Sequence, residues 1–390
     1  MAGCLDGIRV IDLGRYQAGP RCPLILSDLG AEVIKVEAAP NGDESRRLGM
    51  VYWSQYNRGK KSITLNLRSE KGKAILRELV PKADMLLQNF SPGVISEMGF
   101  GYDVLKKLNP RIIMINVSGF GQFGPYRDRR AFDPIGQAMA GVMFNTGSDD
   151  GDGAPVRCGP PIIDRITALH ATIGALAALH RRDVTGKGQA LDVCLLDSAF
   201  TLMEIPIAQY LVTGKEPQRE GNRTGTLAPS NTYKTKDGWV FIIAVQQKMW
   251  DRFCRATKRE DLMNDPRASS VSERAKNGDW IDAQVAAWAR ERTVAEIVET
   301  LAPKGVPCGP VSTIPQAAKD PHLWERKMLV ETDDRDGGKT YVAGLTVKFS
   351  ETPGAVGPIP KAGEHNEDIY CGLLGHSAAD IKSWREEGVV

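Results

Sequence analysis

The chain has 390 residues, of which 42% are apolar and 25% charged, and its formal net charge is +2. This composition is that of an ordinary globular protein, and it excludes a disordered, collagen-like or membrane-embedded chain. The near-neutral charge gives no field that would hold a polyanion, so we expect no nucleic-acid partner. The length exceeds one ordinary hydrophobic core and predicts two domains.

The cysteines, the histidines and the amino-terminal residues bear on the redox state, the metal content and the cellular compartment of the protein. The seven cysteines are odd in number and scattered, without a C-x-x-C pair, which is typical of reduced thiols and not of disulfides or a zinc site. The histidines lack the spacing of metal ligands, so we expect no metal. Residues 1–14 do not resemble a signal peptide, and no run of about 18 apolar residues occurs. We therefore expect a cytoplasmic protein without a membrane partner.

Strands and helices alternate in the first part of the chain. Short β-rich runs with helical stretches between them lie at residues 8–13, 32–36, 62–67, 85–87 and 112–117. This alternation predicts an α/β fold with a parallel sheet covered by helices on both faces. Ligands bind such sheets beyond the carboxyl ends of the strands. The loops of residues 14–19, 88–93 and 118–133 are therefore expected to face one crevice.

The character of the chain changes near Gly221. A connection with glycine, threonine and proline leads into a strand run at residues 233–245, in which residues 236–238 are a hairpin signal. Helical stretches follow, and a second hairpin signal lies at residues 336–338. We predict a large domain of residues 1–220, a smaller α+β domain of residues 221–328 and a return to the large domain over residues 329–390.

Several common enzyme classes lack their motifs in this chain. The loop from Gly14 to Pro20 is not G-x-G-x-x-G, so a dehydrogenase would lack its dinucleotide fingerprint. Glu37, at the end of the second strand, could imitate the acidic ribose contact, but an acidic residue there is usually just solvated. The P-loop, H-E-x-x-H and G-x-S-x-G motifs are also absent, which disfavours kinases, zinc hydrolases and serine hydrolases.

Asp164 stands at the start of a helical stretch and has two interpretations. In one it is the N-cap, whose carboxylate satisfies the first free amides of the helix. In the other it is a nucleophile, because a helix N-terminus favours an ionised carboxylate and supplies backbone donors to an oxyanion. The residues alone leave both interpretations open.

Motifs along nearly the whole chain resemble those of the class III CoA-transferases, the formyl-CoA transferase-like or CaiB/BaiF family. These motifs are Leu5 to Val10, Gln17 to Pro20, Asp28 to Glu37, Asn57 to Ser62, Gln88 to Gly93, Ser118 to Gly121, Thr185 to Gln189, Gly305 to Val311 and Gly363 to His365. Each is short, and only the set is specific. The resemblance implies an interlocked homodimer, in which each subunit has a Rossmann-like large domain and a smaller α+β domain.

The resemblance also implies which residues act. Asp164 matches the family's nucleophilic aspartate, which implies aspartyl anhydride and aspartyl-CoA thioester intermediates. Gln17 and Asp133 match site positions and complete the expected catalytic set. The expected CoA-binding residues are Gln17, Ala18, Leu65, Arg68, Asn89, Phe90, Arg129 and Arg130. Coenzyme A and its thioesters are then substrates, and no tightly bound cofactor is expected.

The chain departs from the formyl-CoA transferases at three places. Residues 221–226 stand where those enzymes have a run of four glycines in a flap over the site. Ala38 and Glu97 stand where they have arginines near the nucleotide. We therefore do not expect formyl or oxalate specificity, and the adenine end of CoA is expected to be held differently.

The expected function is transfer of CoA from an acyl-CoA to a free carboxylic acid. Succinyl-CoA is a candidate donor and a small dicarboxylate a favoured acceptor, because Arg15, Arg47 and Arg165 can pair with a second carboxylate. The alternative is an α-methylacyl-CoA racemase or epimerase, which belongs to the same family and uses a histidine in a G-H-D-like motif. Here that place reads Ala131-Phe132-Asp133, so a two-base proton transfer would lack one partner.

Overall fold

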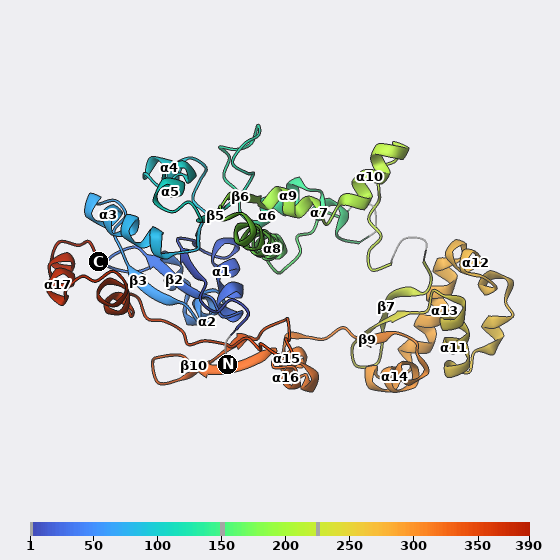
Figure 1. Ribbon diagram of the computed structural model, residues 1–390. Coiled ribbons are helices and arrows are strands. Elements are labelled where there is room, and N and C mark those ends of the chain that lie inside the picture. Colours follow the sequence, from blue (N-terminus) through green and yellow to red (C-terminus); the bar gives the residue numbers. More distant parts are fainter. Residues whose placement is uncertain (1–2, 149–152, 224–226) are drawn as a thin grey trace. The chain divides into compact units, whose positions relative to one another are not determined.

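The computed structural model describes residues 3–148, 153–223 and 227–390, and the chain divides into two compact units (Figure 1). Unit 1 contains Met1–Val142, Arg157–Val212 and Pro321–Val390. Unit 2 contains Met143–Val156 and Thr213–Asp320. Within the stretch that stands in place of the glycine flap, residues 224–226 lie outside the described residues.

Unit 1 is built on a six-stranded parallel sheet with the strand order β3-β2-β1-β4-β5-β6. Its strands are β1 (Arg9–Asp12), β2 (Glu32–Glu37), β3 (Lys61–Thr64), β4 (Met85–Gln88), β5 (Ile113–Ser118) and β6 (Ala190–Cys194). The strands and the parallel sheet expected from the sequence are confirmed. β4 and β5 are buried at every position, as strands covered on both faces are. The strand order reverses between β1 and β4, which is where such sheets bind ligands.

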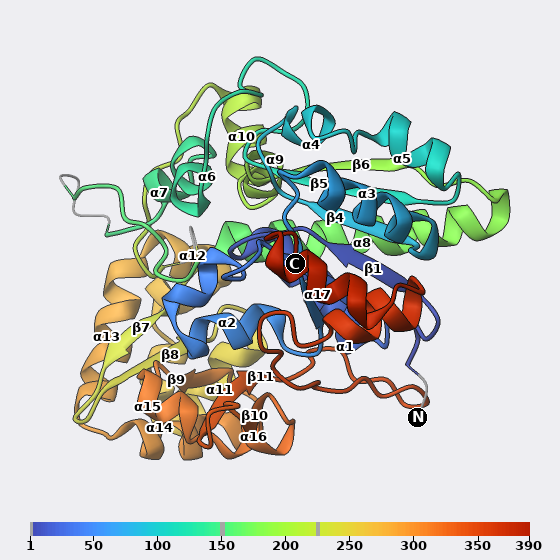
Figure 2. The same cartoon turned by 90° about the vertical axis from the view of Figure 1, so that its left-hand side faces the viewer.

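Helices cover both faces of this sheet. On one face α1 (Ala18–Asp28) and α8 (Ile162–Thr185) pack against each other and against the strands. The other face carries α3 (Glu70–Leu79), α5 (Tyr102–Leu108) and the carboxyl-terminal α17 (Ala378–Glu386). α17 lies far in sequence from the strands that it covers (Figure 2). Among the described residues, α8 is the one helix with the length and apolar composition of a membrane span, and nearly half of that span is buried.

The remaining elements of unit 1 surround the sheet. They are α2 (Met50–Asn57), α4 (Val94–Glu97), α6 (Asp133–Met139), α9 (Leu195–Phe200), α16 (Pro321–Glu325), β10 (Leu329–Asp333) and β11 (Lys339–Ala343), with α7 (Val142–Asn145) and α10 (Glu204–Thr213) at its boundaries with unit 2. β10 and β11 form an antiparallel hairpin, which confirms the turn expected at residues 336–338. The hairpin contacts α2, where the Gln55 side chain donates to the Tyr341 carbonyl at 2.8 Å.

Unit 2 has its own sheet and its own core. Its strands β7 (Ser230–Lys234), β8 (Trp239–Ile243) and β9 (Cys308–Pro310) pair antiparallel, and the β7–β8 turn confirms the hairpin expected at residues 236–238. Its helices are α11 (Gln247–Thr257), α12 (Val271–Lys276), α13 (Gly278–Arg290), α14 (Val294–Leu301) and α15 (Ile314–Ala318). The Phe253 ring lies between those of Trp250 and Trp288, at centroid distances of 5.5 and 5.8 Å.

Candidate active site

Two neighbouring cavities lie at the carboxyl ends of the strands of unit 1. The larger, about 1030 Å³, is lined by residues that follow β2, β3 and β4. The smaller, about 440 Å³, is lined by the loops after β1, β4 and β5. Arg15, Glu44 and Phe90 line both cavities, so the two form adjacent parts of one crevice. The three loops that the sequence predicts at one crevice are therefore brought together.

Most of the predicted site residues meet at the smaller cavity, which is lined by Gln17, Ala18, Asn89, Phe90, Arg129, Arg130 and Asp164. Leu65 and Arg68 line the larger cavity instead. Asp133 lines neither of the two, because it is buried with 3% of its surface exposed. Its predicted catalytic role must therefore act through a neighbour.

That neighbour is Asp164, which is not the N-cap of its helix. α8 begins at Ile162, so Asp164 is the third helical residue, and the N-cap position is held by Pro161, which has no capping side chain. The Asp133 Oδ1 atom accepts the backbone N–H of Ile163 at 2.7 Å and that of Asp164 at 3.2 Å. The N-cap interpretation of Asp164 is therefore wrong. A carboxylate from another helix satisfies these amides and leaves the Asp164 side chain for the cavity.

Gln137 holds Asp133 in this position. Its Nε2 donates to Asp133 Oδ2 at 2.6 Å, and its Oε1 accepts the Cys158 N–H at 2.9 Å. Asp133 and Gln137 lie one turn apart on α6 and so share a face of that helix. Gln137 is not among the residues predicted from the sequence, and its i, i+4 spacing from Asp133 is the signal that points to it. Together these residues tie the loop before α8 to the start of the helix.

The environment of Asp164 makes its carboxyl group unusual. Burial, and then the charge of Asp133, raise the pKa of Asp164 from its ordinary 3.8 to about 7, and Arg165 opposes this rise. No hydrogen bond from the described residues contributes to that pKa. Such a carboxylate is poorly solvated and unpaired, which favours its use as a nucleophile or a base.

Gln17 is oriented by a tyrosine of α2. The Tyr56 hydroxyl donates to Gln17 Oε1 at 2.7 Å. Tyr52 lies beside Tyr56, with ring centroids 5.2 Å apart. Because Tyr56 occupies the amide oxygen, the amide N–H groups are the atoms of Gln17 that can serve a ligand oxygen. Tyr52 and Tyr56 are not among the residues predicted from the sequence, although their i, i+4 spacing directly precedes the motif that starts at Asn57.

The loop after β1 is clamped by Asn89, which comes from the loop after β4. Asn89 Oδ1 accepts the Arg15 N–H at 2.7 Å, and its Nδ2 donates to the Arg15 carbonyl at 2.9 Å. The side chain packs on Gly19, where any Cβ atom would come within 2.8 Å of Asn89 Cγ. Tyr16 has a φ of 60°, a left-handed conformation that is rare outside glycine. The two hydrogen bonds from Asn89 thus fix the main chain of Arg15.

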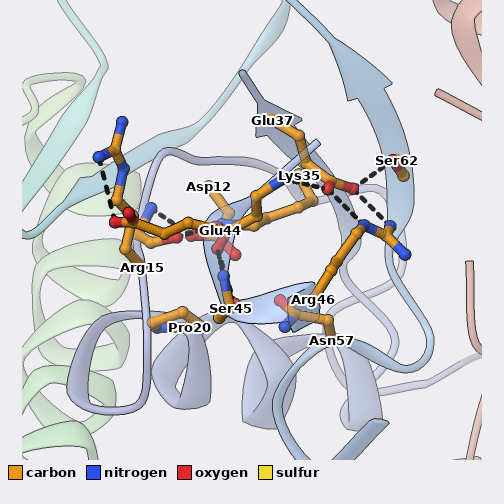
Figure 3. Close-up of polar contacts among 12 residues, drawn as sticks. Asp12, Arg15, Pro20, Lys35, Glu37, Glu44, Ser45, Arg46, Asn57 and Ser62 are labelled. Carbon is orange, nitrogen blue, oxygen red and sulfur yellow. Dashed lines mark hydrogen bonds and ion pairs between the residues drawn. The ribbon is translucent and has the colours of Figure 1, made fainter. Parts of the chain in front are cut away.

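Buried charged side chains, among them Asp12 and Lys35, contact this loop (Figure 3). The Lys60 Nζ atom lies 2.7 Å from the Asp12 carboxylate, and Asp12 also accepts the Gly14 N–H at 2.8 Å. Lys35 donates to the Gly14 carbonyl and lies 3.2 Å from the Asp43 carboxylate. Burial lowers the pKa of Lys60 to about 8. These ion pairs fix the turn that leads into α1.

Glu37 belongs to the same group of buried charges. Its carboxylate accepts hydrogen bonds from Arg46 at 2.6 and 2.7 Å, from Ser62 at 2.5 Å and from the Asp43 N–H at 2.8 Å. The Arg46 guanidinium also lies 3.8 Å from the centroid of the Trp53 ring. The carboxylate is therefore committed to internal partners, and the structure does not place it as a solvated strand-end residue or as a free ribose contact.

Basic side chains surround both cavities. Arg15, Arg129 and Arg130 line the smaller cavity, and Arg129 lies 4.0 Å over the Tyr126 ring. Arg47, Arg68 and Lys73 line the larger cavity, together with Ala38 and Glu97. This arrangement suits a ligand with several phosphates. Within the described ranges, no group of three or more His, Cys, Asp or Glu side chains could hold a metal ion.

Comparison with known proteins identifies similar chains over their full length. The family model described as CoA-transferase family III matches residues 5–366. The chain is 39% identical to a succinyl-CoA–D-citramalate CoA-transferase of Chloroflexus aurantiacus, over 99% of this chain and 98% of that protein. It is 35% identical to a succinyl-CoA:mesaconate CoA-transferase of Haloarcula marismortui, over 99% of both. The crystal structure of a CaiB/BaiF family protein from Brucella suis superposes with a TM-score of 0.85 at 32% identity, covering 96% of this chain and 100% of that one.

Proposed function

This chain belongs to CoA-transferase family III, and on that premise we propose that it transfers CoA from succinyl-CoA to a small dicarboxylic acid through a covalent intermediate on Asp164. Two similar enzymes are named for succinyl-CoA with D-citramalate and with mesaconate, which supports the choice of substrates. The observation that carries the proposed mechanism is the placement of Asp164. Its carboxyl group faces the smaller cavity, while Asp133 satisfies the amides at the start of its helix.

The proposed reaction begins when the Asp164 carboxylate attacks the thioester carbonyl of succinyl-CoA. The C–S bond breaks, CoA leaves as the thiolate, and a mixed anhydride of Asp164 and succinate remains. The thiolate then attacks the aspartyl carbonyl, which releases succinate and leaves an aspartyl-CoA thioester. The acceptor carboxylate takes CoA by the same two steps in reverse. A carboxylate suits this role because acid, anhydride and thioester interconvert without water or a change of oxidation state.

The neighbours of Asp164 have complementary parts in this scheme. The amide N–H groups of Gln17 can donate to the oxyanion that forms at the attacked carbonyl, since Tyr56 holds the amide oxygen. Asp133 positions the first turn of α8, and after burial its charge is the second cause of the raised pKa of Asp164. CoA itself would lie along the two adjacent cavities, with its phosphates near Arg129 and Arg130 of the smaller cavity and near Arg68 and Lys73 of the larger one.

The structure gives the racemase alternative little support. The position where the racemases have their histidine is occupied here by Phe132, whose side chain is largely exposed beside the smaller cavity. A phenylalanine cannot accept or donate a proton, so a two-base mechanism would lack one base.

The chain is also proposed to work as an interlocked homodimer in the cytoplasm. Support for the dimer comes from the family resemblance and from α10, which is largely apolar and buries none of its residues. Its Ile205, Leu211 and Val212 are between 65% and 86% exposed. Apolar surface of this kind marks interaction sites in soluble proteins.

The covalent step can be tested by trapping. We expect that incubation with succinyl-CoA and hydroxylamine converts Asp164 to its hydroxamate, which peptide mass spectrometry would locate. Asp164→Asn should remain unlabelled and lose at least about a thousandfold in turnover. Asp164→Ala is the companion control, because the asparagine can deamidate. Continued turnover of the wild type without modification of Asp164 would refute the mechanism.

The substrates can be tested by CoA exchange. We expect transfer from succinyl-CoA to dicarboxylates such as D-citramalate, mesaconate or malate, and little transfer to formate or oxalate. A racemase would instead exchange the α-proton of a 2-methylacyl-CoA with solvent deuterium and would need no acid acceptor. That exchange, in the absence of CoA transfer, would reverse the assignment.

A further inference from the structure

We propose that Arg15 binds the distal carboxylate of the dicarboxylic substrate, and that Glu44 is an internal carboxylate that competes with the substrate for it. This inference rests on the proposed function, in which donor and acceptor both carry a second carboxylate. It names the residue that distinguishes such acids from monocarboxylic ones.

The location of Arg15 separates it from the other arginines that the sequence offers for this task. Arg15 lines the cavity that holds Asp164. Arg47 lines only the larger cavity, and Arg165 lines neither of the two. The smaller cavity, at about 440 Å³, is near the lower end of the range for small-molecule sites. A four- or five-carbon acid that reacts at Asp164 therefore has its far end close to the other residues that line this cavity.

Hydrogen bonds hold the main chain that carries the Arg15 side chain. Both polar groups of the Asn89 side chain bond the Arg15 main chain, at 2.7 and 2.9 Å. The guanidinium carbon lies 5.3 Å from the centroid of the Phe90 ring, which also lines the cavity. The clamped main chain and the ring contact reduce the conformational freedom that Arg15 loses when it binds an anion.

The contact between Arg15 and Glu44 is weak enough to be replaced (Figure 3). The closest N–O distance is 3.5 Å, and about half of each side chain is exposed, at 46% and 49%. An exposed pair of this kind changes an equilibrium constant by at most about fivefold. A substrate carboxylate can instead engage the planar guanidinium with two parallel hydrogen bonds.

Glu44 also lies close to Tyr16, the residue that follows Arg15 in the loop. After burial, the carboxylate of Glu44 contributes to the raised pKa of the Tyr16 hydroxyl. Glu44 also lines both cavities, so it lies at the junction that a CoA thioester would cross. Glu44 is thus an internal carboxylate with the same chemistry as the distal carboxylate of the substrate.

The two other arginines at this cavity provide the control. Arg129 and Arg130 both line this cavity, and the family resemblance implies that Arg130 lies near the phosphates of CoA. Phosphates are common to every CoA thioester. Neutralising Arg130 should therefore weaken binding of all acyl-CoAs alike, whereas neutralising Arg15 should affect only those with a distal carboxylate.

The test compares succinyl-CoA with butyryl-CoA, which has the same four-carbon chain and a methyl group in place of the carboxylate. Dissociation constants are measured by calorimetry in the Asp164→Asn background, where no turnover intervenes. We expect Arg15→Gln to lower the preference for succinyl-CoA about 10- to 100-fold, with butyryl-CoA unchanged. Arg15→Lys should retain part of the preference. Glu44→Gln should raise it by up to about fivefold, and Arg130→Gln should leave it unchanged.

The outcomes separate this inference from the proposed function. If the wild-type enzyme transfers CoA from succinyl-CoA but Arg15→Gln leaves the preference unchanged, the assignment of Arg15 is wrong and the function stands. If the wild type transfers CoA from no dicarboxylic acyl-CoA, the proposed function falls and the assignment falls with it. Thermal unfolding of each variant shows whether the loop after β1 has kept its fold.

Discussion

At the scale of single residues, two carboxyl groups share one helix N-terminus and have opposite environments. Asp133 is surrounded by donors, with hydrogen bonds from two backbone amides and from the Gln137 side chain. Asp164 has no such donors among the described residues, and it lies next to the charge of Asp133. Proteins commonly give two neighbouring acids different roles by placing them in environments that separate their pKa values. Here one carboxylate supports the helix and the other is left to react.

This pair predicts a specific pH dependence. With the pKa of Asp164 near 7, the nucleophile is increasingly protonated as the pH falls, so kcat/KM should drop about tenfold per unit well below pH 7. Asp133→Asn removes the neighbouring charge that helps to raise this pKa, so the acid limb should move to lower pH. The asparagine oxygen can still accept the Ile163 N–H, but its amide nitrogen replaces the oxygen to which Gln137 donates, so that hydrogen bond is lost. An acid limb at the same pH in wild type and variant would contradict the assigned influence of Asp133.

At the scale of elements, the loop between β1 and α1 depends on a buried ion pair. Lys60 Nζ contacts the Asp12 carboxylate and the Pro20 carbonyl at the start of α1, at 2.7 and 2.8 Å. Both charged side chains are fully buried. A buried pair of this kind need not stabilise the fold relative to apolar residues, but removal of one partner leaves an uncompensated charge.

We therefore expect Lys60→Met to lower the free energy of unfolding by about 3 to 5 kcal/mol, as measured by chemical denaturation. Lys61→Met is the matched control, since the adjacent Lys61 forms a partly exposed pair with Glu32 and should cost less than about 1 kcal/mol. The double variant Asp12→Asn/Lys60→Met should recover part of the loss. Equal effects of Lys60→Met and Lys61→Met would show that burial of the pair does not matter.

The elements also show what the sequence could and could not predict. The strands of unit 1 were predictable because buried parallel strands are short apolar runs separated by helices, a pattern visible within a few residues. The contacts that organise the site join distant residues. Asp133 and Ile163 are 30 positions apart, Gln17 and Tyr56 are 39 apart, and Asp12 and Lys60 are 48 apart. Local patterns therefore suggested that Asp164 caps its own helix. In the folded chain, the side chain that satisfies these amides is Asp133, which lies on another helix, α6.

At the scale of the whole molecule, every predicted site residue lies in unit 1. Unit 2 has its own sheet and aromatic core, and none of the residues assigned to CoA or to catalysis belongs to it. The proposed site thus lies on the sheet where its strand order reverses. The apolar surface of α10 is a separate feature, because among the described residues none of this helix's side chains is buried.

If the proposed dimer forms through α10, a charged residue placed on the apolar surface of this helix should weaken it. Leu211 lies in the last turn of α10 and is 76% exposed, so Leu211→Lys should not disturb the fold of an isolated chain. If α10 packs against a second copy, burial of the lysine charge would be costly, and sedimentation velocity should show monomers where the wild type shows dimers. Val184→Lys is the control, since Val184 is similarly exposed in the last turn of α8. Dimers that persist in Leu211→Lys, or a monomeric wild type, would remove α10 from the proposed interface.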